Sequence, residues 1–319
     1  MRCYMMVPVM ASLMIAGPAL TQEKTNVVLG SSSVGGSYYM YAGGLATFVN
    51  DNSDTLVVTA QTTRGSVENA RLLASGRLDF GFANGGVVYE QNVGKGQFVD
   101  AAADSIRGIA IVDIAPLHLV TFADSGIKTL GDLRDKRVSV GAPGSGSANT
   151  TANLLEAADL ASAIDVRNLG FDESAANMRD GNLDAFSASS SLPMPAVLDL
   201  ATSRDIALLG IDNQVAANLQ EISPAYQKVT IPAGTYPGVD ADVASVGVPS
   251  MLITRADIPD DVVYELVSQI FADEAETYMR NVYNAWSPYP GEGAFGVVGI
   301  PLHPGAERFY REKGMLGQD

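Results

Sequence analysis

The sequence repeats one pattern along its length: an apolar strand, a loop of small polar residues, and then a helix. The pattern covers a strand over residues 27–30, a loop over 31–37 and a helix over 38–49. It returns as a strand over 138–141, a loop over 142–147 and a following helix. Strands that alternate with helices in both halves predict an α/β fold with parallel sheets.

A second pattern, a helix followed by a glycine and an apolar strand, also occurs twice, over residues 66–80 and 174–186. Asp79 and Asp184 hold equivalent places, and we expect both to satisfy backbone groups after the glycine. The alternative is a chance match between two short segments. If the match is real, the chain forms two related lobes with a cleft between them.

The start of the chain has the composition of a secretory signal. Arg2 precedes an apolar run over residues 5–15 and a small-residue stretch over 16–19, which predicts a signal peptide over residues 1–19 and a location in the periplasm. The alternative, a membrane anchor, would need about 20 consecutive apolar residues. Cys3 would leave with the signal.

About 300 residues would remain, which exceeds the size at which a single core stops growing. We predict lobe I over residues 26–117 plus 253–319, and lobe II over 118–252. A strand over 243–254 is expected to pair with the segment near 117–122, so that two crossing segments form a hinge.

The formal net charge of −16 argues against nucleic acid and anionic membranes as partners, because both need a basic surface. It does not exclude an anionic small molecule. A pocket formed by helix N-termini can bind an anion in an acidic protein.

The sequence contains no motif of a nucleophile elbow, a phosphate loop, a dinucleotide site or a zinc protease. His118 and His303 lie in apolar surroundings, where a structural role is expected. The chain is therefore predicted to be no enzyme, with no catalytic residue, no metal and no cofactor. The alternative, an enzyme on the same fold, would have to use Asp79, Asp184 or Tyr236.

Four loops rich in Ser, Thr, Gly and Asn follow predicted strands, over residues 31–37, 62–66, 84–86 and 143–150. Ligands of open α/β sheets bind at this end of the strands, and free N–H groups at helix starts attract anions. Ser66 is expected to cap the helix over 67–75, and residues 84–86 are expected to form a turn. Turn and capping roles alone would also explain these residue types.

Two further residue types point to a binding loop. Tyr38 and Tyr236 are candidates to form the wall of a small-ligand pocket. Arg64 precedes a helix start in a polar loop and could hold a carboxylate through two hydrogen bonds. The alternative for Arg64 is a solvated surface residue.

Several motifs together resemble the TAXI-type solute-binding proteins of TRAP transporters. They span nearly all of the predicted mature chain in order, and the two most specific are Gly-Ala-Pro-Gly-Ser-Gly and Ala-Gly-Thr-Tyr-Pro-Gly. The motifs lie at residues 35–39, 65–69, 125–130, 138–146, 231–238 and 301–308.

The resemblance implies a type II periplasmic binding protein fold, with two lobes joined by a two-strand hinge and the ligand in the cleft. It implies a monomer that captures a 2-oxoglutarate-like organic acid or a glutamate-like amino acid and delivers it to TRAP membrane subunits. The binding protein of an ABC uptake system is the alternative. The predicted ligand-binding residues are Ser33, Tyr38, Arg64, Ser66, Asn84, Gly144, Ser145, Ser147, Ser191 and Tyr236.

The chain departs from the family pattern at three of these places. It has Asn84-Gly85 where relatives commonly have glutamine and a small polar or acidic residue, and Ser190-Ser191 where they favour glycines. Arg64 stands where a small residue is frequent. These departures fall in the loops expected to select the solute.

Overall fold

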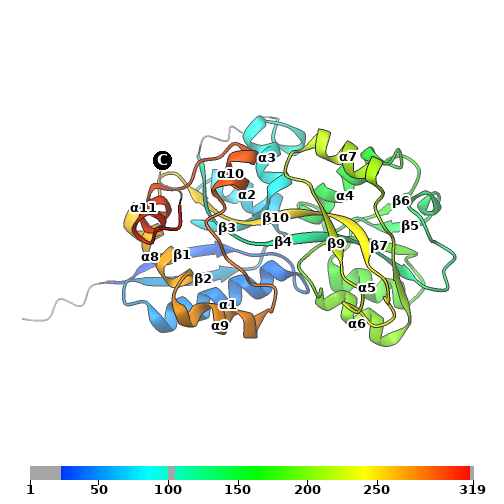
Figure 1. Cartoon of the computed structure of the whole chain (residues 1–319), viewed down its shortest axis with the longest axis horizontal. Helices are drawn as coiled ribbons and strands as arrows, with labels where there is room; N and C mark the ends of the chain where they lie inside the picture. Colours follow the sequence, from blue (N-terminus) through cyan, green and yellow to red (C-terminus); the bar gives the residue numbers. More distant parts are fainter. Residues whose placement is uncertain (1–22, 100–104, 317–319) are drawn as a thin grey trace, which may run out of the picture.

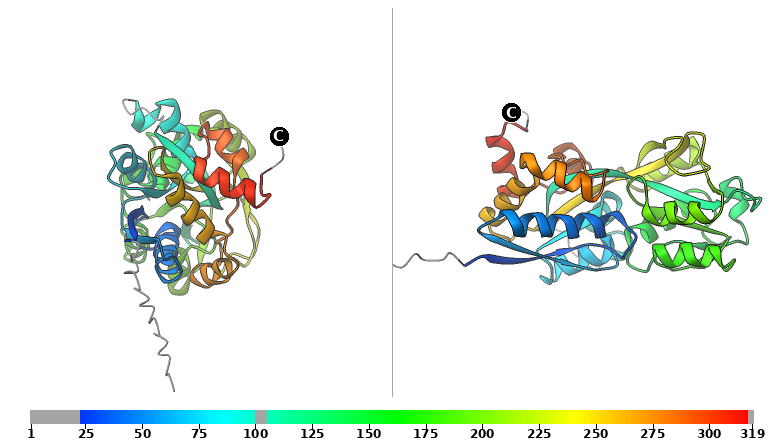
Figure 2. Two further views of the ribbon diagram at one scale, coloured as in Figure 1. Left: turned by 90° about the vertical axis from the view of Figure 1, so that its left-hand side faces the viewer. Right: turned by 90° about the horizontal axis from the view of Figure 1, so that it is seen from below.

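Two long strands run along the long axis of the molecule and are shared by its two ends (Figures 1 and 2). They are β4 (Ile106–Phe122) and β10 (Val243–Arg255), which pair antiparallel. The computed structural model describes residues 23–99 and 105–316. The predicted signal peptide and Cys3 therefore lie outside the described residues.

Lobe I is formed by a parallel unit in the strand order β2-β1-β3, which joins the sheet through β10. Its helices pack on both faces of this part of the sheet (Figure 1). The elements of the unit are β1 (Thr25–Gly30), α1 (Ser37–Asn52), β2 (Leu56–Gln61), α2 (Ser66–Ala74) and β3 (Phe80–Asn84). The remaining elements of this lobe are α3 (Gly85–Val93), η1 (Gly96–Phe98), α8 (Asp260–Ile270), α9 (Asp273–Val282), α10 (Glu292–Val298) and α11 (Pro304–Glu312).

Lobe II contains a second parallel unit, in the strand order β6-β5-β7, which joins the sheet through β4. The elements of the unit are β5 (Arg137–Ser139), α4 (Gly146–Ala157), β6 (Asp165–Arg167), α5 (Phe171–Arg179) and β7 (Ala185–Ser189). The other elements are η2 (Leu130–Leu133), α6 (Pro195–Ser203), β8 (Ile206–Leu208), α7 (Asn213–Ile222) and β9 (Gln227–Ile231).

The two units have the same strand order, and the repeated aspartates do the same work in both. Asp79 Oδ2 accepts a hydrogen bond from the Val28 N–H in β1 (2.8 Å), and Asp184 Oδ2 accepts one from the Arg137 N–H in β5 (2.8 Å). Each carboxylate thus ties the start of the third strand to the first strand of its unit. The predicted backbone role of these aspartates is confirmed.

The structure corrects the prediction of two strands around Pro116, because β4 is continuous through it. Proline lacks only the N–H donor, and the Pro116 carbonyl accepts a hydrogen bond from the Ser190 N–H (3.2 Å). The predicted partner of β10 was also wrong. Residues 106–116 pair with β10, whereas residues 117–122 pair with β7 and β8.

The turn predicted at residues 84–86 is the start of helix α3. The Asn84 Oδ1 atom accepts a hydrogen bond from the Val87 N–H (2.9 Å) and so caps the helix. Gly85 packs so closely that a Cβ atom would lie 2.8 Å from Pro249 Cγ. Gly85 therefore serves close packing here and not a turn.

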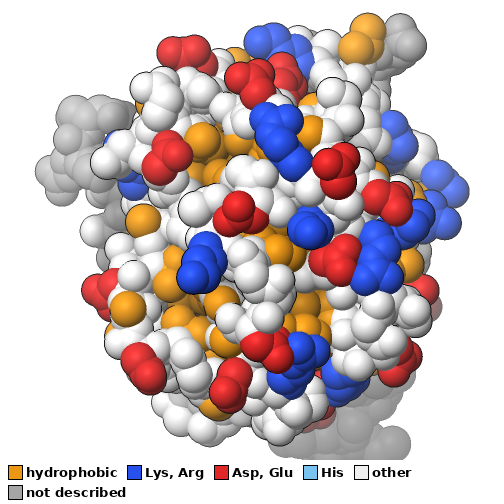
Figure 3. Space-filling model, turned by 90° about the vertical axis from the view of Figure 1, so that its right-hand side faces the viewer, with side chains coloured by type: hydrophobic (Ala, Val, Ile, Leu, Met, Phe, Trp, Pro, Cys, Tyr) orange, Lys and Arg blue, Asp and Glu red, His pale blue; other side chains and the backbone are white. Residues whose placement is uncertain are grey.

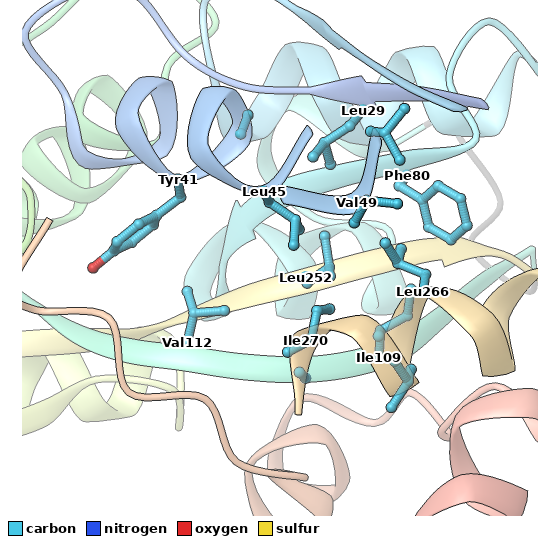
Figure 4. Packing of buried hydrophobic residues seen from close by; sticks show 14 of the residues in the cluster. Leu29, Tyr41, Leu45, Val49, Phe80, Ile109, Val112, Leu252, Leu266 and Ile270 are labelled. Atoms are coloured by element: carbon cyan, nitrogen blue, oxygen red, sulfur yellow. The ribbon is translucent and has the colours of Figure 1, made fainter. Parts of the chain in front are cut away.

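The main core cluster of lobe I lies between the sheet and the helices on one of its faces (Figure 4), and a second cluster includes residues of α2, α3 and α10. Leu29 from β1, Leu45 from α1, Phe80 from β3 and Leu252 from β10 are fully buried in one cluster, together with Leu266 from α8. Because these residues come from both ends of the lobe's sequence, the C-terminal helices are part of the same core. Lobe II has separate clusters of its own.

The end face of lobe II carries acidic and basic side chains interspersed with small apolar areas (Figure 3). This face therefore has no strong charge of one sign. Across the part of the chain that the structure describes, no helix has both the length and the apolar character needed to cross a membrane.

We expect Leu252→Ala to lower the free energy of unfolding by about 2–5 kcal/mol, because it opens a cavity in the shared core of lobe I. Urea denaturation followed by circular dichroism measures the change. Val297→Ala is the control, since this side chain is about half exposed (49%) and should change stability by less than about 0.5 kcal/mol. Equal effects of the two substitutions would contradict this account of the core.

Candidate functional site

A small pocket lies where the two lobes meet. It has a volume of about 30 Å³, and since about 10–15 Å³ holds one water molecule, it admits a group of only a few atoms. Lobe I contributes Ser32, Gly36, Ser37, Tyr38, Arg64, Gly65, Ser66 and Asn84, and lobe II contributes Ser145, Gly146, Ser147, Phe171 and Ser189. The lining therefore comes from both lobes.

The pocket is surrounded by the N-termini of helices. The starts of α1 and α2 reach it from lobe I, and the starts of α4 and α5 reach it from lobe II. The N-caps of α1, α2 and α5 are Gly36, Gly65 and Gly170, and none of them supplies a side-chain hydrogen bond to its helix. Helix starts without side-chain caps present free N–H donors and the positive end of the helix dipole.

The side chains that line the pocket add further hydrogen-bond donors and no negative charge. Six of them are serines, and no Asp or Glu lines the pocket among the residues that the structure describes. Burial raises the pKa of Tyr38, so its phenol stays protonated. Arg64 is exposed at the rim and supplies a positive charge. The pocket therefore favours an anion.

The two lobes touch closely around the pocket. The Glu68 N–H donates to the Gly144 carbonyl (3.1 Å), and Asn84 Nδ2 donates to Thr150 Oγ1 (3.3 Å). A Cβ atom on Gly146 would lie 2.4 Å from Ser66 Oγ and 2.5 Å from Asn84 Nδ2. Glycine at this first position of α4 is what lets the lobes approach.

Six of the predicted ligand-binding residues line the pocket: Tyr38, Arg64, Ser66, Asn84, Ser145 and Ser147. Gly144 lies beside it and accepts the bond from Glu68. Ser33 is partly exposed, lies outside the lining, and accepts hydrogen bonds through its carbonyl. The structure thus gathers most of these residues in one place.

Ser66 has a different local role from the one predicted. It is the first residue of α2, and its Oγ accepts a hydrogen bond from the Asn84 N–H (3.0 Å). Gly65, which has a φ of 111°, occupies the N-cap position instead. The hydroxyl therefore links two pocket loops and does not cap its own helix.

Ser191 lies outside the pocket lining, in a buried polar cluster between the lobes. Its hydroxyl bonds to the carboxyl group of Asp113, which also accepts a bond from the Tyr41 hydroxyl (2.5 Å). The Tyr41 hydroxyl points away from the apolar core of lobe I (Figure 4). Burial raises the pKa of Asp113, and the bonds from Ser191 and Tyr41 oppose that rise.

Tyr236 also lies outside the pocket lining and is buried in lobe II. Its hydroxyl lies 2.7 Å from His118 Nε2 and accepts a hydrogen bond from the Met194 N–H (2.8 Å). His118 Nδ1 lies 3.2 Å from the Ala188 carbonyl. A neutral His118 that donates from Nδ1 and accepts at Nε2 satisfies both contacts.

The structural role predicted for both histidines is confirmed. His118 is fully buried in the contacts just described, and His303 caps α11 by accepting a bond from the Gly305 N–H (3.1 Å). Nε2 of His303 lies 3.0 Å from the Ile258 carbonyl.

Sequence reasoning missed several lining residues. Ser32, Ser37 and Gly146 lie in the loops predicted to bind the ligand, over residues 31–37 and 143–150, so their neighbours in the sequence already indicate them. Ser189 is the last residue of β7, and the end of a strand is likewise where a ligand is expected to bind. Phe171 gave no signal, because an apolar residue at a helix start reads as part of the core.

Comparison with known proteins extends this description. The model of the NMT1-like family matches residues 29–314 of the chain. A binding protein component of an ABC phosphonate transporter from Pseudomonas aeruginosa has a similar structure, with a TM-score of 0.55 and 14% identity over 83% of this chain and 80% of that one.

Two more solved structures are similar. A putative L-cystine ABC transporter protein from Listeria monocytogenes gives a TM-score of 0.50 and 12% identity, over 82% of this chain and 95% of that one. A protein from Bordetella bronchiseptica RB50 gives 0.52 and 16%, over 91% and 98%. These likenesses show the fold, and the predicted two-lobed α/β fold of periplasmic binding proteins is confirmed.

We expect Gly146→Ala to force the lobes apart, because its methyl group would collide with Ser66 and Asn84. Small-angle X-ray scattering should show a larger radius of gyration. Gly43→Ala is the matched control, since a Cβ atom on this helical glycine would meet no atom of the described part of the chain within 4 Å. An unchanged radius for Gly146→Ala would show that the contact is not what limits closure.

His118 makes stability depend on pH. Burial lowers its pKa to about 4, below the ordinary value of 6.5, so between these values the unfolded chain binds a proton that the folded chain does not. Stability is therefore retained above pH 6.5 and lost as the pH falls, by about 2 kcal/mol at pH 5. Urea denaturation at pH 7 and pH 5 should show this loss of stability. Between the same two pH values, the stability of His118→Gln should fall by about 2 kcal/mol less than that of the parent protein. Equal losses in both proteins would contradict the assignment.

Proposed function

We propose that this chain, which belongs to the NMT1-like family, is a solute-binding protein that closes two lobes around a small anion and delivers it to a membrane transporter. Its place of action would be the periplasm, and its role would be binding without turnover. The family match and the shared fold support the transporter role.

One observation carries the proposal: the starts of four helices from two lobes face one small pocket. The starts of α1, α2 and α5 have no side-chain cap and so leave N–H groups free, and all four helix starts carry a partial positive charge. An anion between them would satisfy donors of both lobes at once. It would therefore bind the closed form more tightly than the open form and shift the population toward closure.

The class of solute follows from the lining. A carboxylate accepts several hydrogen bonds, and serine hydroxyls, the neutral Tyr38 phenol and Arg64 all donate them. An acidic amino acid also carries an ammonium group, which buried sites commonly pair with a carboxylate. Because none of the described residues that line the pocket is Asp or Glu, a simple organic acid fits better than an amino acid.

For the membrane partner, we propose an ABC uptake system. Two proteins of similar fold are named as ABC transporter components, which supports this choice. The second candidate is a TRAP transporter, which the Gly-Ala-Pro-Gly-Ser-Gly and Ala-Gly-Thr-Tyr-Pro-Gly motifs favour by resemblance. An ATP-binding subunit encoded beside this chain would support the first, and fused or paired membrane subunits without one would support the second.

Titration calorimetry with succinate, 2-oxoglutarate, glutamate and inorganic phosphate tests the proposal. We expect at least one of the organic acids to bind, with one of its carboxylate groups in the pocket. Arg64→Ala should weaken its binding by at least tenfold, about 1.4 kcal/mol, because the rim loses its positive charge. Arg64→Lys should retain part of the affinity.

Arg77→Ala is the control, since Arg77 is also exposed in lobe I but does not line the pocket. Unchanged affinity in Arg64→Ala would show that Arg64 is a solvated surface residue without a role in binding. If none of the four anions binds, the small-anion proposal fails.

A further inference from the structure

A buried carboxylate joins the two lobes outside the pocket. Glu90 lies on α3 in lobe I and is 5% exposed. Its Oε2 accepts a hydrogen bond from Asn149 Nδ2 (2.7 Å), and its Oε1 accepts one from Asn153 Nδ2 (2.9 Å). Among the described residues, both side-chain donors recorded for this carboxylate come from α4, in the other lobe.

The two asparagines are placed to act together. They stand four residues apart on α4, so they lie on the same face of the helix. Asn153 also donates to the Tyr226 hydroxyl (3.0 Å), which fixes its orientation. The carboxylate therefore binds α4 at two successive turns of the helix.

The helix that Glu90 binds is also the one that supplies the pocket. The N-terminus of α4 brings Ser145, Gly146 and Ser147 to the lining. Any shift of α4 relative to α3 moves these groups relative to the starts of α1 and α2. A bond between α3 and α4 thus sets the distance between the two halves of the anion site.

We propose that Glu90 is a positioning residue that latches the closed form through Asn149 and Asn153. The inference rests on the proposed function, in which the lobes open and close around a solute. On opening, the carboxylate loses its amide donors and is hydrated instead. On closure, two charge-assisted hydrogen bonds replace the hydrogen bonds between this carboxylate and water. The closed form is therefore populated before the solute binds.

The latch would act on affinity without touching the solute. The apparent dissociation constant equals the intrinsic constant divided by the fraction of protein in the competent closed form. Loss of the latch lowers that fraction, so binding weakens although every pocket residue remains. This separates Glu90 from a residue that contacts the solute.

Electron–electron double resonance on the protein without added solute tests the latch. Spin labels are placed on Ala74→Cys in lobe I and Glu156→Cys in lobe II, both exposed, in a chain that also carries Cys3→Ser. Glu90→Ala should raise the ratio of long to short distances by about tenfold, the effect of losing charge-assisted bonds. Glu90→Gln keeps one acceptor oxygen, so its ratio of long to short distances should lie between those of the parent protein and of Glu90→Ala.

Gln91→Ala is the matched control. Gln91 is the next residue on α3, is also buried, and donates to the Ala70 carbonyl within lobe I (3.3 Å). This substitution should lower the melting temperature without changing the distances. Equal distance changes in both variants, no change in Glu90→Ala, or the absence of a short distance in the parent would each overturn the latch.

The result does not depend on the identity of the solute. A distance change specific to Glu90→Ala, together with no binding of the four anions, would uphold the latch and reject the proposed solute class. Binding of one of the anions, together with unchanged distances in Glu90→Ala, would support the proposed solute class and reject the latch.

Discussion

The antiparallel pairing of β4 with β10 is the constraint on which the rest of this structure depends. Both strands continue from one lobe into the other, so each lobe completes its sheet with the same two strands. Relative motion of the lobes must therefore bend this pair. The pairing register shifts between Ser250 and Met251, opposite Asp113 and Ile111, and such irregularities increase local twist and bending. Asp113, Tyr41 and Ser191 form their buried contacts at the same level, so one group of polar contacts between the lobes lies beside this irregularity.

The pocket follows from the repeated topology. The unit β2-β1-β3 and the unit β6-β5-β7 have the same order, and in each the helices begin at the carboxyl ends of the strands. When the shared strands bring those ends face to face, helix starts of both lobes meet. The residues between strand and helix must then have small side chains, because Gly146 approaches Ser66 and Asn84 more closely than a Cβ atom permits. Serine and glycine in these loops thus serve close approach and hydrogen bonding together.

Much of this could be predicted from the sequence, because the relevant signals are local. The alternation of strands and helices, the position of Asp79 and Asp184 directly before a strand, and the gathering of Tyr38, Ser66 and Ser145 at strand ends can be read from neighbouring residues. The partners of the two aspartates cannot, since Val28 and Arg137 lie 51 and 47 residues away in the chain. The misreadings concern long-range packing. Nothing near Pro116 shows that Ser190 will bond to its carbonyl, and nothing near Tyr236 shows that His118 will lie against it. The motif around Tyr236 predicts a ligand wall, whereas the hydroxyl of this tyrosine contacts His118 and Met194 within lobe II.

The electrostatics of the site also explain how so acidic a chain can offer a place to an anion. The net charge of −16 is spread over the surface, where water and salt screen it, whereas the pocket is governed by helix starts and hydroxyl groups a few ångströms away. Gly36, Gly65 and Gly170 leave three of those helix starts without a side-chain cap, which costs stability while the pocket is open. Contacts that do not involve the solute, such as those of Glu90 with α4, offset part of that cost on closure. The site can thus remain uncapped for its solute because other bonds between the lobes hold the helices in place.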